Sequence, residues 1–109
     1  MRKSLLVLVA LVVTLLAVVP AFAQDPVEVK MWIAFTDNRL DWAKQKAAVF
    51  NEKFPQYNVV VEGYNNYEEL FAATALAAEQ NSLPAIVQYF EVATQDARDS
   101  GYFKPIAEA

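Results

Sequence analysis

Tyr67 and Glu91 are the two residues of this sequence whose types and positions suggest ligand binding. Tyr67 follows the valine-rich run at residues 58–62, and Glu91 comes directly after the apolar run at residues 85–90. Such runs are typical of strands in a parallel sheet, and these sheets bind ligands beyond the carboxyl ends of their strands. A carboxylate accepts hydrogen bonds from ligand hydroxyls, and a phenol can donate or accept them. From position alone, a tyrosine packed on a loop and a carboxylate at a helix start are equally open interpretations.

Several kinds of catalytic site are excluded by composition. The sequence has no histidine and no cysteine, so nucleophilic triads, imidazole-bound metals and thiolate sites cannot form within it. Its two glycines, Gly63 and Gly101, are too few for a phosphate-binding glycine loop. Glu68 and Glu69 are adjacent at a predicted helix start, which favours a helix-dipole role over a pair of catalytic carboxylates. We therefore expect no cofactor, no metal and no enzymatic activity from these residues.

The sequence pattern predicts an α/β fold in which strands and helices alternate. Predicted strands cover residues 27–35, 58–62 and 85–90, and predicted helices cover residues 40–54, 67–80 and 94–100. Helices between short strands indicate a parallel sheet with flanking helices. We expect the third strand to be buried on both faces, because it is nearly continuously apolar. We also expect adjacent strands to bring Tyr67 and Glu91 to one crevice.

Local signals define the predicted helices. Residues 36–38 and Asn66 are candidate N-caps, Asn66 with Glu69 resembles a capping box, and Gly101 is the expected C-terminal cap of the third helix. The second helix is expected to face inward with Leu70, Phe71, Thr74, Ala77 and Ala78. The first helix carries one apolar stripe at helical spacing, formed by Leu40, Ala43, Ala47, Phe50 and Phe54. Trp32, within the first strand, and Trp42, beside this stripe, are aromatic candidates for stacking on a sugar or polyol, but we expect both to pack in the core.

Residues 1–23 have the pattern of a secretory signal peptide. A basic start at Arg2 and Lys3 precedes a short apolar run at residues 5–19, and small residues end the segment. The alternative, a membrane anchor, needs about 20 apolar residues. We expect cleavage after Ala23 and a periplasmic or extracellular location. The net charge is −4, and losing the two basic residues makes it more negative, which argues against nucleic acid as a partner.

Particular motifs in residues 27–106 resemble the extracellular solute-binding proteins of ABC importers for sugars and polyols. The likeness is carried by Trp32, by Phe50-Asn51 followed by Pro55-Gln56-Tyr57, by Asn66-Tyr67-Glu68, and by the run from Pro84 to Val92. It is greatest for the glycerol-3-phosphate binders of that family. The resemblance implies a periplasmic-binding-protein-like fold, with residues 24–109 forming the amino-terminal part of the first of two lobes.

The resemblance also implies the role of the site residues. Tyr67 and Glu91 match positions that contact ligand in the glycerol-3-phosphate binders, and the phosphate-facing cation of those proteins lies in later segments. The implied function is a monomeric substrate-binding subunit that delivers its ligand to membrane permease subunits. Glycerol-3-phosphate, a glycerophosphodiester and a related sugar or polyol all remain candidate ligands, because residues 33–37 depart from the family pattern. If the ligand is phosphorylated, we expect this lobe to hold its hydroxyl end, since Glu91 would repel phosphate.

Two further classes of function remain open at the level of sequence. One is an exported carbohydrate-active or phosphodiester hydrolase whose catalytic groups lie downstream. The other is a complete small interaction domain, which a sheet with an uncovered edge disfavours.

Overall fold

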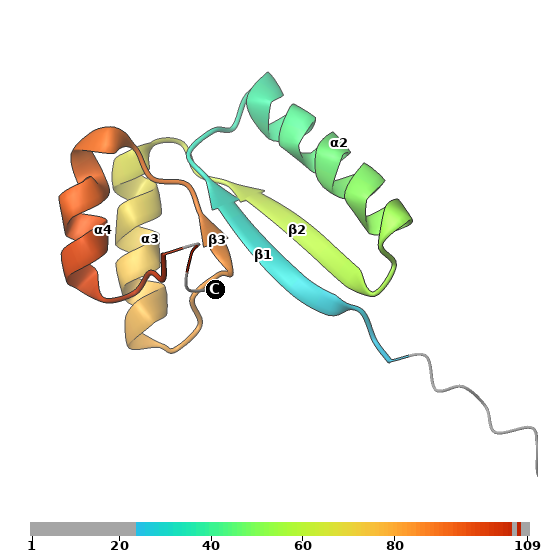
Figure 1. Ribbon diagram of the computed structural model, residues 1–109. Coiled ribbons are helices and arrows are strands. Elements are labelled where there is room, and N and C mark those ends of the chain that lie inside the picture. The colour runs from blue at the N-terminus through green and yellow to red at the C-terminus, as the bar shows by residue number, and fades with distance from the viewer. Residues whose placement is uncertain (1–23, 106, 108–109) are drawn as a thin grey trace, which may run out of the picture.

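A computed structural model of the protein describes residues 24–105 and residue 107. The predicted signal peptide at residues 1–23 lies outside the described residues. The described chain alternates strands and helices (Figure 1). In order, the elements are β1 (Val27–Ile33), α2 (Asn38–Lys53), β2 (Tyr57–Gly63), α3 (Tyr67–Glu79), β3 (Ile86–Val87), the 3-10 turn η1 (Glu91–Ala93) and α4 (Thr94–Ser100).

The three strands form one parallel sheet in the order β2-β1-β3. The expectation of an α/β fold with a parallel sheet is thus confirmed. Hydrogen bonds continue beyond the paired strands on both sides of β1: Tyr64 N donates to Ile33 O at 2.8 Å, and Gln88 N donates to Trp32 O at 2.9 Å. The strands β2 and β3 are not neighbours, because β1 lies between them. The expectation that Tyr67 and Glu91 follow adjacent strands was therefore wrong.

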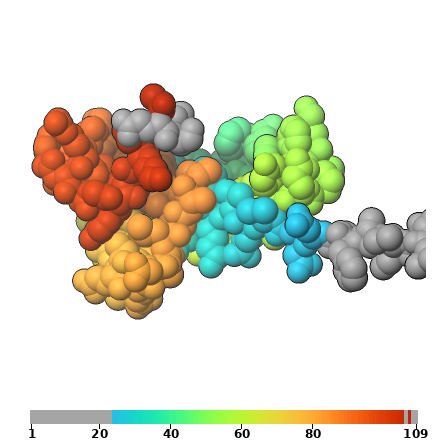
Figure 2. Space-filling model, turned by 60° about the horizontal axis from the view of Figure 1, so that its bottom comes forward, coloured from blue at the N-terminus to red at the C-terminus, as the bar shows by residue number. Residues whose placement is uncertain are grey.

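The helices lie on both sides of the sheet. In Figure 1, α2 lies on one side of the strands, and α3 and α4 lie on the other. Figure 2 shows α2 and the α3–α4 pair as two masses joined across the strands. The inward side predicted for the second helix is confirmed for Leu70, Thr74 and Ala77, which are buried, whereas Phe71 and Ala78 of the same predicted side are half-buried. The Thr74 hydroxyl donates to Leu70 O at 2.8 Å, so this buried polar group is satisfied within the helix.

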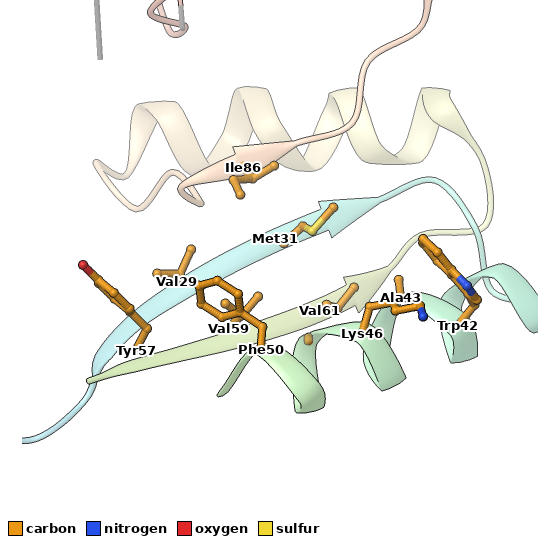
Figure 3. Close-up of a pocket in the computed structure, with 11 residues that line it drawn as sticks. Val29, Met31, Trp42, Ala43, Lys46, Phe50, Tyr57, Val59, Val61 and Ile86 are labelled. Atoms are coloured by element: carbon orange, nitrogen blue, oxygen red, sulfur yellow. The ribbon is translucent and has the colours of Figure 1, made fainter. Parts of the chain in front are cut away.

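The helix α2 faces the sheet with its predicted stripe but leaves a groove open. Ala43 and Phe50 of the stripe line an apolar hollow of about 430 Å³ between α2 and the strands (Figure 3). No residue of α2 is buried in the described structure. The prediction of a core position for Trp42 was wrong: it is 61% exposed, at one end of this groove. The physical reason is that α2 lies along β2 and does not extend over β3. Its apolar stripe therefore packs against β2 only, and Trp42 stays exposed beside the groove.

The third strand is shorter and more exposed than predicted. Pairing with β1 covers Ile86 and Val87 only, although residues 85–90 were expected to form the strand. Ile86 is 46% exposed because its side chain faces the open groove. Tyr89 and Phe90 leave the sheet and stack on Phe71 of α3, at centroid distances of 4.3 and 5.6 Å. Aromatic stacking on α3 thus replaces continued pairing with β1.

Two polar side chains fix the two ends of α2. Asp37 caps α2 by accepting a hydrogen bond from Arg39 N at 3.0 Å. At the other end of α2, the Asn51 amide bonds both backbone groups of Val59: Val59 N donates to Asn51 Oδ1 at 2.8 Å, and Asn51 Nδ2 donates to Val59 O at 3.1 Å. Asn51 therefore covers the outer edge of β2 at its middle.

Gly63, the last residue of β2, lies against the loop that follows β1. A Cβ at this position would lie 2.3 Å from Phe35 O and 2.6 Å from Leu40 Cδ2. The absence of a side chain lets the loop after β1 cross the end of β2.

None of the helices in residues 24–105 is long and apolar enough to span a bilayer.

Candidate ligand-binding site

The start of α3 is fixed by a network of side chains that places Tyr67. Asn66 Oδ1 accepts a hydrogen bond from Glu69 N at 2.8 Å, as expected for an N-cap. Glu69 reaches back to Asn65, whose Nδ2 donates to Glu69 Oε2 at 2.8 Å and whose N donates to the same oxygen at 3.3 Å. The capping box predicted from sequence is present, but its reciprocal bond goes one residue earlier than the usual pattern. Tyr67 is consequently the first residue of a firmly capped helix.

The ring of Tyr67 lies in an aromatic cluster at the carboxyl edge of the sheet. It stacks on Phe90 with a centroid distance of 4.5 Å and an interplanar angle of 27°. Phe71 lies 6.0 Å away, and Phe35 presents its edge at 6.4 Å. Such contacts fix the plane of a phenol and leave its hydroxyl as the polar end.

Gln88 joins three chain segments at this edge. Its side chain accepts a hydrogen bond from Ala34 N at 2.9 Å, and its Nε2 donates to the Tyr67 hydroxyl at 3.1 Å. Ala34 follows β1, and Gln88 follows β3. The chain after β1 leads to α2 on one side of the sheet, and the chain after β3 leads to α4 on the other side (Figure 1). Open α/β sheets bind ligands at such a switch point between neighbouring strands. The Tyr67 hydroxyl therefore lies at the position where a ligand crevice is expected, although Tyr67 itself follows β2.

Gln88 was not identified as a site residue from the sequence. The signal was available, because Gln88 is the one polar side chain in residues 85–88 of the apolar run. A polar side chain in a segment predicted to be buried needs hydrogen-bonding partners. For Gln88 these partners are Ala34 N and the Tyr67 hydroxyl, which connect it to the predicted site.

Glu91 lies at the same edge as Tyr67, next to Phe90 in the chain. It is exposed and begins η1, whose position is fixed by a hydrogen bond from Thr94 Oγ1 to Glu91 O at 2.8 Å. Within the described residues, no hydrogen bond joins the side chains of Tyr67 and Glu91. The structure thus places both predicted residues around Phe90 and leaves the Glu91 carboxylate open to solvent.

Arg39 is a cation on the α2 side of the crevice, but its charge is compensated. Its guanidinium donates through Nε and Nη2 to the Asp37 carboxylate at 2.7–3.1 Å and lies 3.6 Å from the centre of the Phe35 ring. Hydrogen bonding from Arg39 lowers the pKa of Asp37 from 3.8 to about 2. Together with Gln88 and Phe35, Arg39 lines a hollow of about 350 Å³. This edge is therefore suited to hydroxyl groups more than to a dianion.

Trp42 lines the same hollow as Arg39, Phe35 and Gln88, and the backbone oxygen of Trp32 accepts the hydrogen bond from Gln88 N. Trp32 packs on Tyr64 with a centroid distance of 5.2 Å, which agrees with the expected packing role. Its Nε1 is buried and has no hydrogen-bond partner in the described structure. In residues 24–105, no group of three acidic side chains is arranged to hold a metal ion.

Comparison with protein-family models, with curated protein sequences and with solved structures finds no match to this chain. The functional interpretation accordingly depends on the geometry above and on the motifs at Asn66-Tyr67-Glu68 and residues 84–92.

Proposed function

We propose that this chain belongs to the exported substrate-binding subunit of an ABC importer and has a periplasmic-binding-protein-like fold. The proposed ligand is glycerol-3-phosphate, a glycerophosphodiester or a related sugar or polyol. The observation that carries the proposal is the meeting of Tyr67, Gln88 and the η1 start at the switch point between β1 and β3. A parallel sheet that presents a phenol and a carboxylate at this edge suits a ligand rich in hydroxyls.

The proposed mechanism is capture between two lobes followed by delivery to permease subunits in the membrane. The Glu91 carboxylate would accept hydrogen bonds from ligand hydroxyls, and the Tyr67 hydroxyl would bond a neighbouring ligand oxygen. A phosphate group would face the second lobe, because Glu91 repels it and Arg39 is already paired with Asp37. Closure by a hinge would then remove the bound ligand from solvent. A ligand-bound structure with phosphate oxygens against Glu91 would contradict this orientation.

Isothermal titration of the complete protein tests the proposal. The probes are glycerol-3-phosphate, glycerophosphocholine and maltose, and we expect at least one to bind. Glu91→Gln should weaken that binding by about 10-fold or more, because hydrogen bonds to a charged group contribute about 1.5–3 kcal/mol. Tyr67→Phe should weaken it by about 2- to 12-fold, because a neutral hydrogen bond contributes about 0.5–1.5 kcal/mol.

Matched controls separate these effects from general changes in charge or stability. Glu79→Gln alters an exposed carboxylate at the last residue of α3, and Tyr57→Phe alters an exposed phenol at the first residue of β2, far from the carboxyl edge. Neither change should affect affinity. Unchanged affinity in both Glu91→Gln and Tyr67→Phe would remove these residues from the site, and turnover of glycerophosphocholine would favour a hydrolase.

A further inference from the structure

We propose that Gln88 is a positioning residue that makes the Tyr67 hydroxyl a hydrogen-bond donor to the ligand. The inference rests on the proposed function, and it assigns a role to a side chain that lies within the motif at residues 84–92 but that the resemblance does not name as a ligand contact. Its basis is the direction of two hydrogen bonds that meet at one amide.

The orientation of the Gln88 amide is determined by its backbone partner. A backbone N–H can only donate, so the group that faces Ala34 N at 2.9 Å must be the amide oxygen. The amide nitrogen must then face Tyr67, and it lies 3.1 Å from the phenol oxygen. An amide NH₂ can only donate, so the Tyr67 oxygen is the acceptor in this bond.

This bond determines what Tyr67 offers to a ligand. One lone pair of its oxygen is occupied by Gln88, and its own proton is directed away from that donor. The ring cannot turn to change this arrangement, because it is stacked on Phe90 and flanked by Phe71. Tyr67 therefore donates towards the crevice while the Glu91 carboxylate accepts. A ligand must supply an acceptor oxygen near Tyr67 and a hydroxyl proton near Glu91, as a vicinal diol does.

The substitution Gln88→Glu reverses this polarity with little change in shape. A carboxylate keeps the bond from Ala34 N but cannot donate to Tyr67, so the Tyr67 proton turns inward to bond it. We expect affinity for the best of the three probes to fall about 2- to 12-fold, which corresponds to losing one hydrogen bond of about 0.5–1.5 kcal/mol. Gln88→Met, which removes both bonds, should weaken binding less than Gln88→Glu because the phenol proton is then free to point outward.

Coupling to Tyr67 distinguishes positioning from a structural effect. In a Tyr67→Phe background there is no proton to direct, so Gln88→Glu should change affinity by less than about 2-fold. A role in stability alone would produce the same loss of affinity in both backgrounds. Gln80→Glu, which adds the same charge at the exposed C-cap of α3, controls for electrostatics and should leave affinity unchanged.

Each outcome of this titration decides the inference. Loss of affinity with Gln88→Glu that disappears in the Tyr67→Phe background supports it. Equal losses in the two backgrounds, or wild-type affinity in Gln88→Glu, overturn it while leaving the proposed function intact. If Gln88→Glu does not fold, Gln88→Met is measured in the same two backgrounds: a loss of affinity in the Tyr67 background alone supports the inference, and equal losses in both overturn it. If the wild-type protein binds none of the probes, the proposed function fails and the inference fails with it.

Discussion

The substitution Gly63→Ala tests the steric consequence of the close contact between Gly63 and the loop after β1. Gly63 does not have the positive φ that marks Gly101, so an alanine can adopt its backbone conformation. Without a steric conflict, replacing a glycine at such a position stabilises a protein by about 0.4–1 kcal/mol, because the unfolded chain loses freedom. The sign of the change therefore depends on the neighbours of the added methyl group.

Those neighbours predict destabilisation. The added Cβ would lie 2.3 Å from Phe35 O, whereas carbon and oxygen atoms in contact are usually about 3.3 Å apart. One backbone segment must move by about 1 Å, and overpacking of this kind costs about 1–3 kcal/mol. Leu40, whose Cδ2 lies 2.6 Å from the added Cβ, can rotate away, but the carbonyl cannot. Adding Leu40→Ala to Gly63→Ala should therefore restore little of the lost stability.

Urea unfolding of the wild-type protein and its variants measures this change. Gly101→Ala is the contrasting case: its Cβ meets no atom within 4 Å, but its φ of 71° is unfavourable for alanine. Asparagine tolerates this left-handed conformation, so Gly101→Asn should recover part of the loss, whereas Gly63→Asn should be worse than Gly63→Ala. A midpoint for Gly63→Ala equal to or above that of the wild type would refute the argument.

Three further predictions concern stability and ionisation. Asn51→Ala should lower the free energy of unfolding by about 1–3 kcal/mol, because it removes the Asn51 clamp, the two hydrogen bonds from the Asn51 amide to the backbone of Val59. Gln45→Ala on the exposed face of α2 is the matched control in urea unfolding. Equal midpoints for the two variants would contradict a stabilising role of the clamp. The contribution of Asp37 should be complete above about pH 4 and disappear as the pH falls through its folded pKa of about 2; in an NMR titration, Arg39→Gln should return that pKa towards 3.8, and an unchanged value would exclude Arg39 as the cause. Burial, aided by the negative charge of nearby Asp96, raises the pKa of Tyr89, so the neutral phenol stabilises the fold below about pH 10 and this contribution is lost as the pH rises through the raised value. Burial raises the pKa of Tyr64 as well, so the phenolate absorbance removed by Tyr89→Phe should come from a late-titrating component that the two tyrosines share.

Local signals in the sequence were sufficient to place the helices. The Asn66 cap predicted the first residue of α3, and three of the five residues predicted for its inward side, Leu70, Thr74 and Ala77, are buried. Gly101 was expected to end the last helix, and it does so with a φ of 71°. These predictions succeed because caps and periodicity act within a few residues of one another.

Features that depend on distant segments could not be predicted in the same way. The strand order β2-β1-β3 is a property of long-range pairing, so the sequence did not reveal that β1 separates β2 from β3. Trp42 was assigned to the core from its place beside an apolar stripe, but its exposure depends on where α2 lies relative to β3. Gln88 acquires its role from partners 21 and 54 residues away in the chain.

The hydrogen bonds from Asn51 to Val59 make the two outer strands of the sheet, β2 and β3, different as edges. A bare strand edge is a template on which another chain can add a strand, and such addition is a common route to aggregation. At β2 the backbone groups of Val59 are already bonded by the Asn51 amide, so an incoming strand would have to displace a side chain held by two bonds. No described strand pairs with the outer side of β3, whose first residue, Ile86, is exposed. Among the described residues no side chain bonds the outer side of β3 in this way, so we expect an added strand to pair with β3 before β2.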